Sequence, residues 1–159
     1  MKIEIIAVGK VREKHLKLGI DEFKKRLQPY CTLALTEVRD EQAPEHLSEK
    51  DLTRIKVIEG ERILQKIKQG AYVIALDVHG NQWSSEDFAE QLAQISYQGK
   101  NNITFIIGGS NGLSDAVLTR ANKKLSFSLM TFPHQLMKLI LLEQVYRAFK
   151  IQKREPYHK

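Results

Sequence analysis

Residues 105–114 read FIIGGSNGLS, a short apolar run that ends in three glycines and then turns polar. The apolar residues before Gly108 are typical of a buried strand, and the polar residues after Gly112 are typical of a helix start. A glycine-rich link between a strand and a helix occurs in phosphate loops, in dinucleotide-binding folds and in plain tight turns. The residues around this stretch distinguish among the three.

Two of these interpretations fail on spacing. A Walker phosphate loop needs a lysine directly after its last glycine, and none follows here. The dinucleotide fingerprint G-x-G-x-x-G follows the first strand of its unit and precedes an acidic residue by about twenty positions. Here the spacing is G-G-x-x-G after a late strand, and no Asp or Glu lies between Asp115 and Glu143. The remaining interpretations are a tight turn and a loop whose bare backbone approaches a ligand.

Short apolar strands alternate with amphipathic helices along the whole chain. The expected strands are 3–8, 32–38, 71–76, 103–107 and 124–129, and the expected helices are 14–28, 48–70, one capped by Ser84 or Ser85, a short one from Ser114 and a long one from Pro133 to about Ile151. This alternation predicts an α/β fold with a mostly parallel sheet flanked by helices. Ligands of such sheets bind beyond the carboxyl ends of the strands, which here are Asp77–Gly80, Gly108–Gly112 and the segment after Phe127.

The composition fits one globular domain that spans residues 1–159. With 42% hydrophobic and 28% charged residues, the chain is neither disordered nor fibrous. The single cysteine, Cys31, cannot form an internal disulfide, and no His or Cys spacing matches a metal site. The N-terminus MKIEIIAVGK is no signal peptide, and Lys138 and Glu143 interrupt the most apolar late stretch. We therefore expect a cytoplasmic protein with no metal and no membrane partner.

Basic residues gather near both ends of the chain. The formal net charge is +6, with seven basic and three acidic residues in 10–26 and five basic and one acidic in 147–159. This distribution suits a polyanionic partner such as nucleic acid, although two solvated helix faces would look the same.

Several segments together carry a more specific resemblance. They are LD at 76–77, IGGSNGLS at 107–114, LSFSLMTFPHQLMKLILLEQVYRAF at 125–149 and REPYHK at 154–159. In order and spacing, over the whole chain, they resemble the small bacterial ribosomal pseudouridine N3-methyltransferases of the SPOUT (α/β-knot) superfamily. The resemblance implies a C-terminal trefoil knot, a homodimer, S-adenosylmethionine (AdoMet) as methyl donor without a metal, and a pseudouridine of large-subunit (23S) ribosomal RNA as substrate.

The resemblance also implies site residues. Those that line the cofactor would be Leu76, Gly108, Phe127, Ser128, Leu129, Met130, Thr131 and Phe132. A narrow apolar slot with backbone hydrogen bonds suits adenine, and Gly108 would let the main chain pack against the ligand. From periodicity alone, Phe127 and Phe132 would be core residues. His134 is expected to pack near the pocket, and Trp83 has no assigned role.

The C-terminal tail is the candidate catalytic segment. By itself a polar terminus is expected to be disordered. With the resemblance, Tyr157 is expected to stack on the target base, and His158 to take the N3 proton or to orient the base. The residues expected to contact RNA phosphate are Arg147, Lys150, Lys153, Arg154 and Lys159. Arg154 stands where this family often has Gly, and Lys138 stands where Arg is common.

Three functions follow from these observations. The first is an AdoMet-dependent ribosomal RNA methyltransferase. The second is a non-catalytic RNA-binding or ribosome-associated module, which the basic ends alone support equally well. The third is a small-molecule nucleotide enzyme of ordinary α/β topology. The apolar positions of 136–149 exceed one amphipathic face, and a symmetric dimer would bury the surplus.

Overall fold

The computed structural model describes residues 1–159, with five parallel strands in one sheet of order β2-β1-β4-β3-β5. The strands are β1 (Lys2–Val8), β2 (Thr32–Val38), β3 (Tyr72–Gln82), β4 (Asn102–Ile107) and β5 (Lys123–Ser126). The helices are α1 (Lys14–Leu27), α2 (Glu49–Lys66), α3 (Ser85–Tyr97), α4 (Asp115–Arg120) and α5 (His134–Gln152). The predicted α/β fold with a parallel sheet and flanking helices is confirmed.

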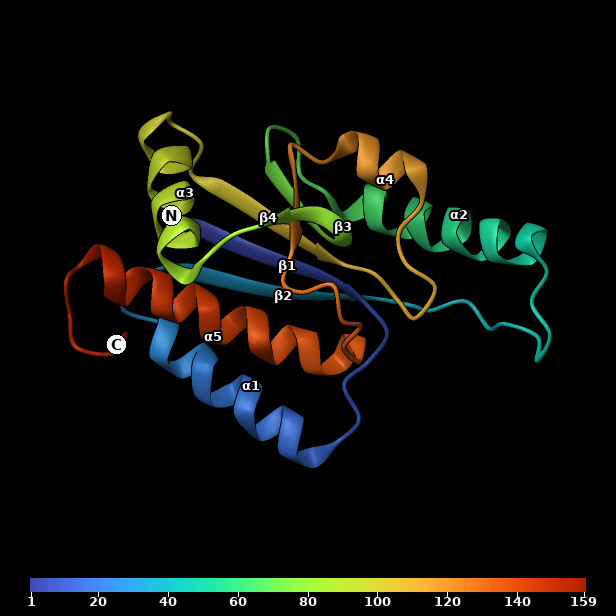
Figure 1. Ribbon diagram of the computed structural model, residues 1–159, viewed down its shortest axis with the longest axis horizontal. Coiled ribbons are helices and arrows are strands. Elements are labelled where there is room, and N and C mark those ends of the chain that lie inside the picture. The colour runs from blue at the N-terminus through green and yellow to red at the C-terminus, as the bar shows by residue number, and fades with distance from the viewer.

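Helices cover both faces of the sheet (Figure 1). Ile3 and Ile5 of β1 belong to a core that includes α1, α3 and α5, whereas Ile6 and Val8 belong to a second core beneath α2 and α4. Successive side chains of a strand point to opposite faces, so a strand covered on both faces is apolar at nearly every position. This is why β1 and β4 are apolar after their first residues, apart from the buried Glu4 and Thr104.

The starts of two helices agree with their sequence signals. At α2, the Ser48 side chain accepts a hydrogen bond from the Asp51 N–H, and the Asp51 carboxylate accepts one from the Ser48 N–H. Ser84 and Asp87 form the same capping box at α3, so Ser84 rather than Ser85 is the cap. These reciprocal bonds satisfy orphan backbone donors at each helix start.

Two strand boundaries differ from the prediction. β3 does not end at Leu76; it resumes its pairing with β5 at Asn81 and Gln82 after an irregularity between Leu76 and Asn81. Their polar side chains hide this extension in the sequence. Here the chain passes very close to β5, because a Cβ on Gly80 would lie 2.6 Å from the Lys124 carbonyl carbon. The C-terminal trefoil knot that the family resemblance implies stays a prediction.

β5 is shorter than expected because serines redirect the chain after it. The Ser126 hydroxyl donates to the Ser128 carbonyl (3.0 Å), and the Ser128 hydroxyl accepts from the Met130 N–H (3.0 Å). Such local side-chain bonds compete with the strand ladder. The segment 127–132 is therefore a non-helical turn region and not the end of a strand.

Helix α5 buries most of its apolar side chains inside the protomer. It packs between α1 and α3, and Leu141, Leu142 and Val145 are completely buried. Tyr146 and Phe149 are also buried, whereas Leu136, Leu139 and Ile140 are only partly covered. The predicted surplus for a dimer thus shrinks to these last three residues. None of the helices is both long and apolar enough to cross a membrane.

Candidate functional site

A cavity of about 440 Å³ opens at the carboxyl ends of β3, β4 and β5. This is the edge at which parallel sheets bind ligands, and the volume is within the range of small-molecule sites. Seven of the eight residues predicted to contact the cofactor line it: Leu76, Gly108, Phe127, Ser128, Met130, Thr131 and Phe132. Residues far apart in the sequence therefore meet at one place.

The eighth predicted residue, Leu129, does not line this cavity. Leu129 is 77% exposed, and the neighbouring Met130 is 73% exposed. Leu129 lies within the turn that Ser126 and Ser128 stabilise, where it is exposed to solvent.

The glycine loop is shaped by its own packing. A Cβ on Gly108 would lie 3.0 Å from Leu113 Cδ2 and 3.2 Å from the carbonyl carbon of Gly112, so it would meet the loop itself before any ligand. Gly112 has a φ of +87°, a conformation that L residues seldom adopt. Gly108 lines the cavity with its backbone, but the reason for a glycine there is closure of the loop.

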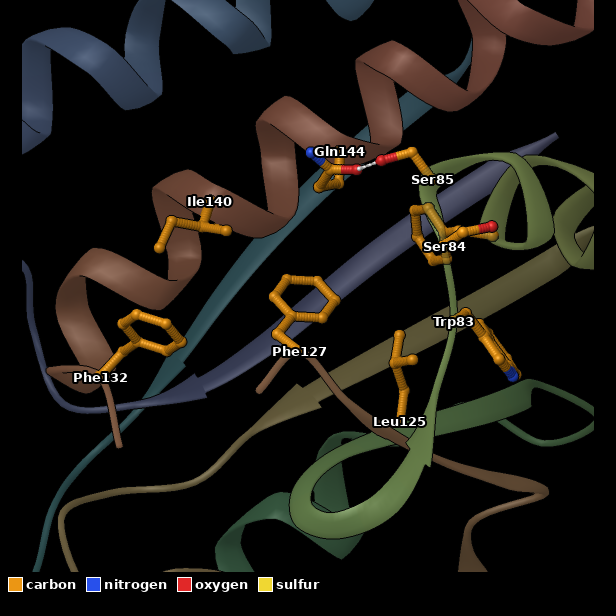
Figure 2. Close-up of a pocket in the computed structure, with 9 residues that line it drawn as sticks. Trp83, Ser84, Ser85, Leu125, Phe127, Phe132, Ile140 and Gln144 are labelled. Carbon is orange, nitrogen blue, oxygen red and sulfur yellow. Dashed lines mark hydrogen bonds between the residues drawn. The ribbon is translucent and has the colours of Figure 1, made fainter. Parts of the chain in front are cut away.

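A second, smaller cavity of about 260 Å³, drawn in Figure 2, shares lining residues with the first. Phe127 and Phe132 line both cavities, and in this one they face Ile140 of α5. On its far side the Ser85 hydroxyl donates to Gln144 Oε1 at 2.7 Å. Trp83 also lines this cavity and packs against the Phe88 ring, with 6.3 Å between the ring centroids.

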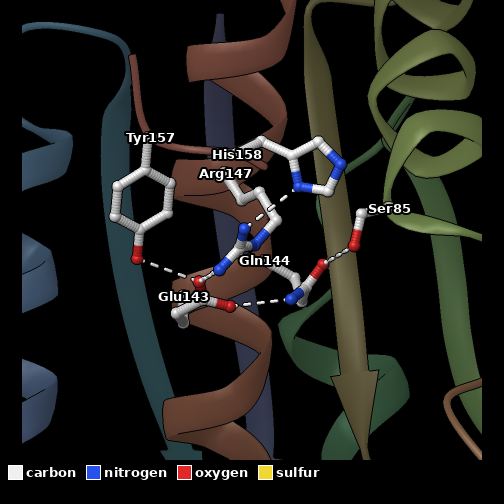
Figure 3. A network of polar contacts seen from close by, with 6 residues as sticks. All are labelled: Ser85, Glu143, Gln144, Arg147, Tyr157 and His158. Atoms are coloured by element: carbon white, nitrogen blue, oxygen red, sulfur yellow. Dashed lines mark hydrogen bonds and ion pairs between the residues drawn. The ribbon is translucent and has the colours of Figure 1, made fainter.

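The C-terminal tail folds back onto α5 and is not disordered (Figure 3). The Tyr157 hydroxyl donates to Glu143 Oε1 (2.9 Å), and its ring meets Tyr146 edge-on at 4.9 Å between centroids. The Arg147 guanidinium lies 4.7 Å from the centroid of the same ring and pairs with Glu143. Burial and the bond to Glu143 raise the pKa of Tyr157, so it remains a neutral phenol at physiological pH.

His158 lies between two charged groups of opposite sign. Its Nε2 is 2.6 Å from Glu86 Oε1, and its Nδ1 is 3.1 Å from Arg147 Nη1. The bond from His158 is the main reason that the pKa of Glu86 is lowered. Neither Tyr157 nor His158 lines either cavity. Since a helix rises about 1.5 Å per residue, Arg147 lies roughly 20 Å along α5 from His134, which lines the first cavity.

The five residues predicted to contact RNA fall into two groups. Arg147 pairs with Glu143 at 2.5 Å, and Lys150 pairs with Glu155 at 2.7 Å. Lys150 therefore holds the pKa of Glu155 below its usual range. The other three residues are exposed: Lys153, Arg154 and Lys159. They are the ones whose charge is available to a polyanion.

Sequence reasoning missed Glu59 of α2. This carboxylate is buried, with 4% of its surface exposed, and it lies directly behind Gly109 of the glycine loop. Burial is the main reason that its pKa is raised. Glu59 stands four residues after Ile55 and four before Ile63, on the buried face of α2, so the helical spacing of the apolar residues was the signal that could have found it.

No group of three or more His, Cys, Asp or Glu side chains is arranged to hold a metal ion.

The family model described as "Predicted SPOUT methyltransferase" matches residues 1–158. The chain belongs to this family. The residues that line the first cavity thus lie in a SPOUT methyltransferase, as the sequence resemblance predicted.

Full-length relatives agree with the family. The chain is 58% identical over 159 residues to proteins named "Ribosomal RNA large subunit methyltransferase H" from Bacillus pumilus (strain SAFR-032) and Clostridioides difficile (strain 630). It is 52% identical to the protein of that name from Enterococcus faecalis (strain ATCC 700802 / V583). In each case all of both chains is covered.

A solved structure is similar in fold. It is a probable methylase family protein from Haemophilus influenzae Rd KW20, with a TM-score of 0.57 and 14% identity. The match covers 99% of this SPOUT chain and 70% of the other chain. At this identity the likeness concerns the fold alone.

Proposed function

We propose that this protein is a ribosomal RNA methyltransferase that uses AdoMet and modifies N3 of a pseudouridine in the large subunit. One observation carries the proposal: seven of the eight residues implied by the family resemblance line one cavity at the carboxyl edge of the sheet. The full-length relatives named for large-subunit ribosomal RNA methylation support the substrate class. Action on ribosomes would place the protein in the cytoplasm.

The cavity suits AdoMet in its chemistry. Leu76, Phe127 and Phe132 offer apolar surface for the adenine ring, and the turn at 127–132 offers backbone donors and acceptors. The serine bonds that fix this turn keep the wall preorganised, which lowers the cost of ordering it on binding. When bound, AdoMet would supply a methyl group already activated by its sulfonium, so no metal is needed.

The tail would complete the site from a second protomer. Within one chain, Tyr157 and His158 of the tail pack against the C-terminal half of α5, well away from the cavity. Leu129 and Met130 are exposed at the cavity rim, and Ile140 is only partly covered, so apolar surface is available for a second copy. A homodimer would bury it and bring one protomer's tail to the other's cavity. There His158 would take the N3 proton or orient the base, and Tyr157 would stack on it.

Two measurements test this function. Calorimetry with AdoMet should give micromolar or tighter binding, and ribosomes from cells lacking this protein should accept a methyl group that mass spectrometry places on a pseudouridine. His158→Ala should leave AdoMet affinity unchanged and lower methyl transfer about 10²-fold, the scale of a lost acid–base group. A protein that binds RNA but not AdoMet would be the non-catalytic module instead.

A further inference from the structure

Glu59 is a buried carboxylate with one oxygen left without a partner. Its Oε2 accepts a hydrogen bond from the Glu41 N–H at 3.0 Å. Its Oε1 is buried and has no hydrogen-bond partner. An unsatisfied buried polar atom destabilises the folded state, and more strongly when it carries charge. A carboxylate kept under these conditions needs an explanation.

No positive side chain forms a salt bridge with Glu59. The nearby Arg62 is engaged elsewhere: it donates to the Arg39 carbonyl at 2.9 Å and pairs with Glu41 at 2.8 Å. Glu59 lines a small crevice beside the glycine loop together with Asp40, Glu41 and His134. The negative charges of Asp40 and Glu41 repel that of Glu59 and so raise its pKa further. Arg62 offsets part of the charge on Glu59, but burial together with Asp40 and Glu41 outweighs it, so the carboxylate is left without a full counter-charge.

Only the backbone of Gly109 separates this carboxylate from the methyl-donor cavity. Gly109 lines the cavity, and a Cβ on it would lie 3.3 and 3.4 Å from the two Glu59 oxygens and 3.2 Å from Val8 Cγ1. The φ of Gly109 is not positive, so its conformation does not require glycine. The missing side chain instead allows the loop to approach Glu59 closely.

We propose that Glu59 determines cofactor specificity: its charge makes the cavity favour the cationic methyl donor AdoMet over the neutral product S-adenosylhomocysteine. This rests on the proposed function, because it takes AdoMet as the donor. In methyl transfer the S–CH₃ bond breaks with its electron pair left on sulfur, so a sulfonium becomes a neutral thioether. The N3 proton leaves to a base, and the methyl carbon bonds to N3.

The electrostatics are large enough to matter. At an effective dielectric of about 20 and a separation of about 10 Å, two unit charges interact strongly enough to change an affinity more than tenfold. A buried charge is also screened weakly by salt. Glu59 would therefore strengthen AdoMet binding without strengthening that of the product, which would limit product inhibition.

The test is calorimetry on the full chain with three ligands: AdoMet, S-adenosylhomocysteine and a cationic AdoMet analogue with an amine-bearing carbon in place of the sulfonium. Glu59→Gln keeps the shape and an oxygen that can accept from the Glu41 N–H, but removes the charge. It should lower the affinity for AdoMet and for the cationic analogue at least tenfold, and it should change the affinity for S-adenosylhomocysteine less than twofold. Glu61→Gln, the same change at an exposed position of α2, is the matched control and should change none of them.

Glu59→Asp separates charge from structure. It keeps the charge but shortens the side chain, so the ratio of the AdoMet affinity to the S-adenosylhomocysteine affinity should stay within about threefold of the wild-type ratio. A merely structural role would reverse this order, with Asp harmful and Gln harmless. The proposal is overturned if Glu59→Gln leaves the ratio unchanged, whether both affinities stay the same or fall together. Failure of the wild-type protein to bind AdoMet would instead remove the proposed function, and this inference with it.

Discussion

Arg154 holds a backbone conformation that favours glycine, and replacing it should stabilise the protein. It is the only non-glycine residue with a positive φ, +55°. The Arg154 N–H donates to the Ile151 carbonyl at 3.1 Å, and the Glu155 N–H donates to the Lys150 carbonyl at 3.0 Å. These two bonds form a Schellman motif at the end of α5, with Arg154 at the position that glycine usually occupies.

The expected gain follows from two opposing contributions. A side chain in the left-handed region costs about 1–2 kcal/mol, and Arg154→Gly removes that cost. Glycine also gives the unfolded chain more freedom, which returns about 0.4–1 kcal/mol. The net gain is about 0.5–1 kcal/mol, or a rise in Tm of roughly 1–4 °C for a chain of this length.

Urea and thermal denaturation of a matched series measure this gain. Arg154→Asn should also stabilise the protein, because asparagine tolerates the left-handed region, whereas Arg154→Lys should be neutral and Arg154→Val destabilising. The reasoning is refuted if Gly and Lys at this position give the same stability. If Arg154 contacts RNA phosphate, Arg154→Gly and Arg154→Asn should each reduce the salt slope of RNA binding by about one, and Arg154→Lys should not.

Three further predictions concern charge and assembly. Neutralising Lys153 and Lys159 together should weaken RNA binding and flatten its salt dependence while AdoMet affinity stays the same; an unchanged slope would mean that these lysines face away from RNA. Light scattering should show a dimer at micromolar concentration, and Ile140→Glu should shift it toward monomer; a wild-type monomer would contradict the composite site. Glu59→Gln should raise the free energy of unfolding at pH 7. Burial raises the pKa of Glu59 above its ordinary value of 4.5, so its destabilising effect is absent below that value and appears as the pH rises through the folded-state pKa. In urea denaturation, Glu59→Gln should therefore be no more stable than the wild type near pH 4. An equal gain in stability at pH 4 and at pH 7 would mean that the buried charge is not its cause.

The sequence by itself determined the fold class and the edge of the sheet that holds the candidate site. Continuous apolar runs such as Phe105–Ile107 identify strands covered on both faces, and the Ser48 cap and a cap at Ser84 or Ser85 place two helix starts, of which the structure selects Ser84. These features depend on neighbours in the chain, so they can be read from local pattern. The family resemblance then indicated which residues would meet at the carboxyl ends of the strands.

Tertiary structure alone decided what each of these residues touches. The extension of β3 to Gln82 depends on pairing with β5, which lies about 40 residues later in the chain. The tail is ordered because Tyr157 meets Tyr146 and Glu143, and His158 meets Glu86, a residue of α3. Glu59 is buried because β2's following segment and the glycine loop close over one turn of α2. Local periodicity can indicate which side of an element is buried, but the partners of each side chain depend on segments brought together in space, and no local pattern in the sequence records those partners.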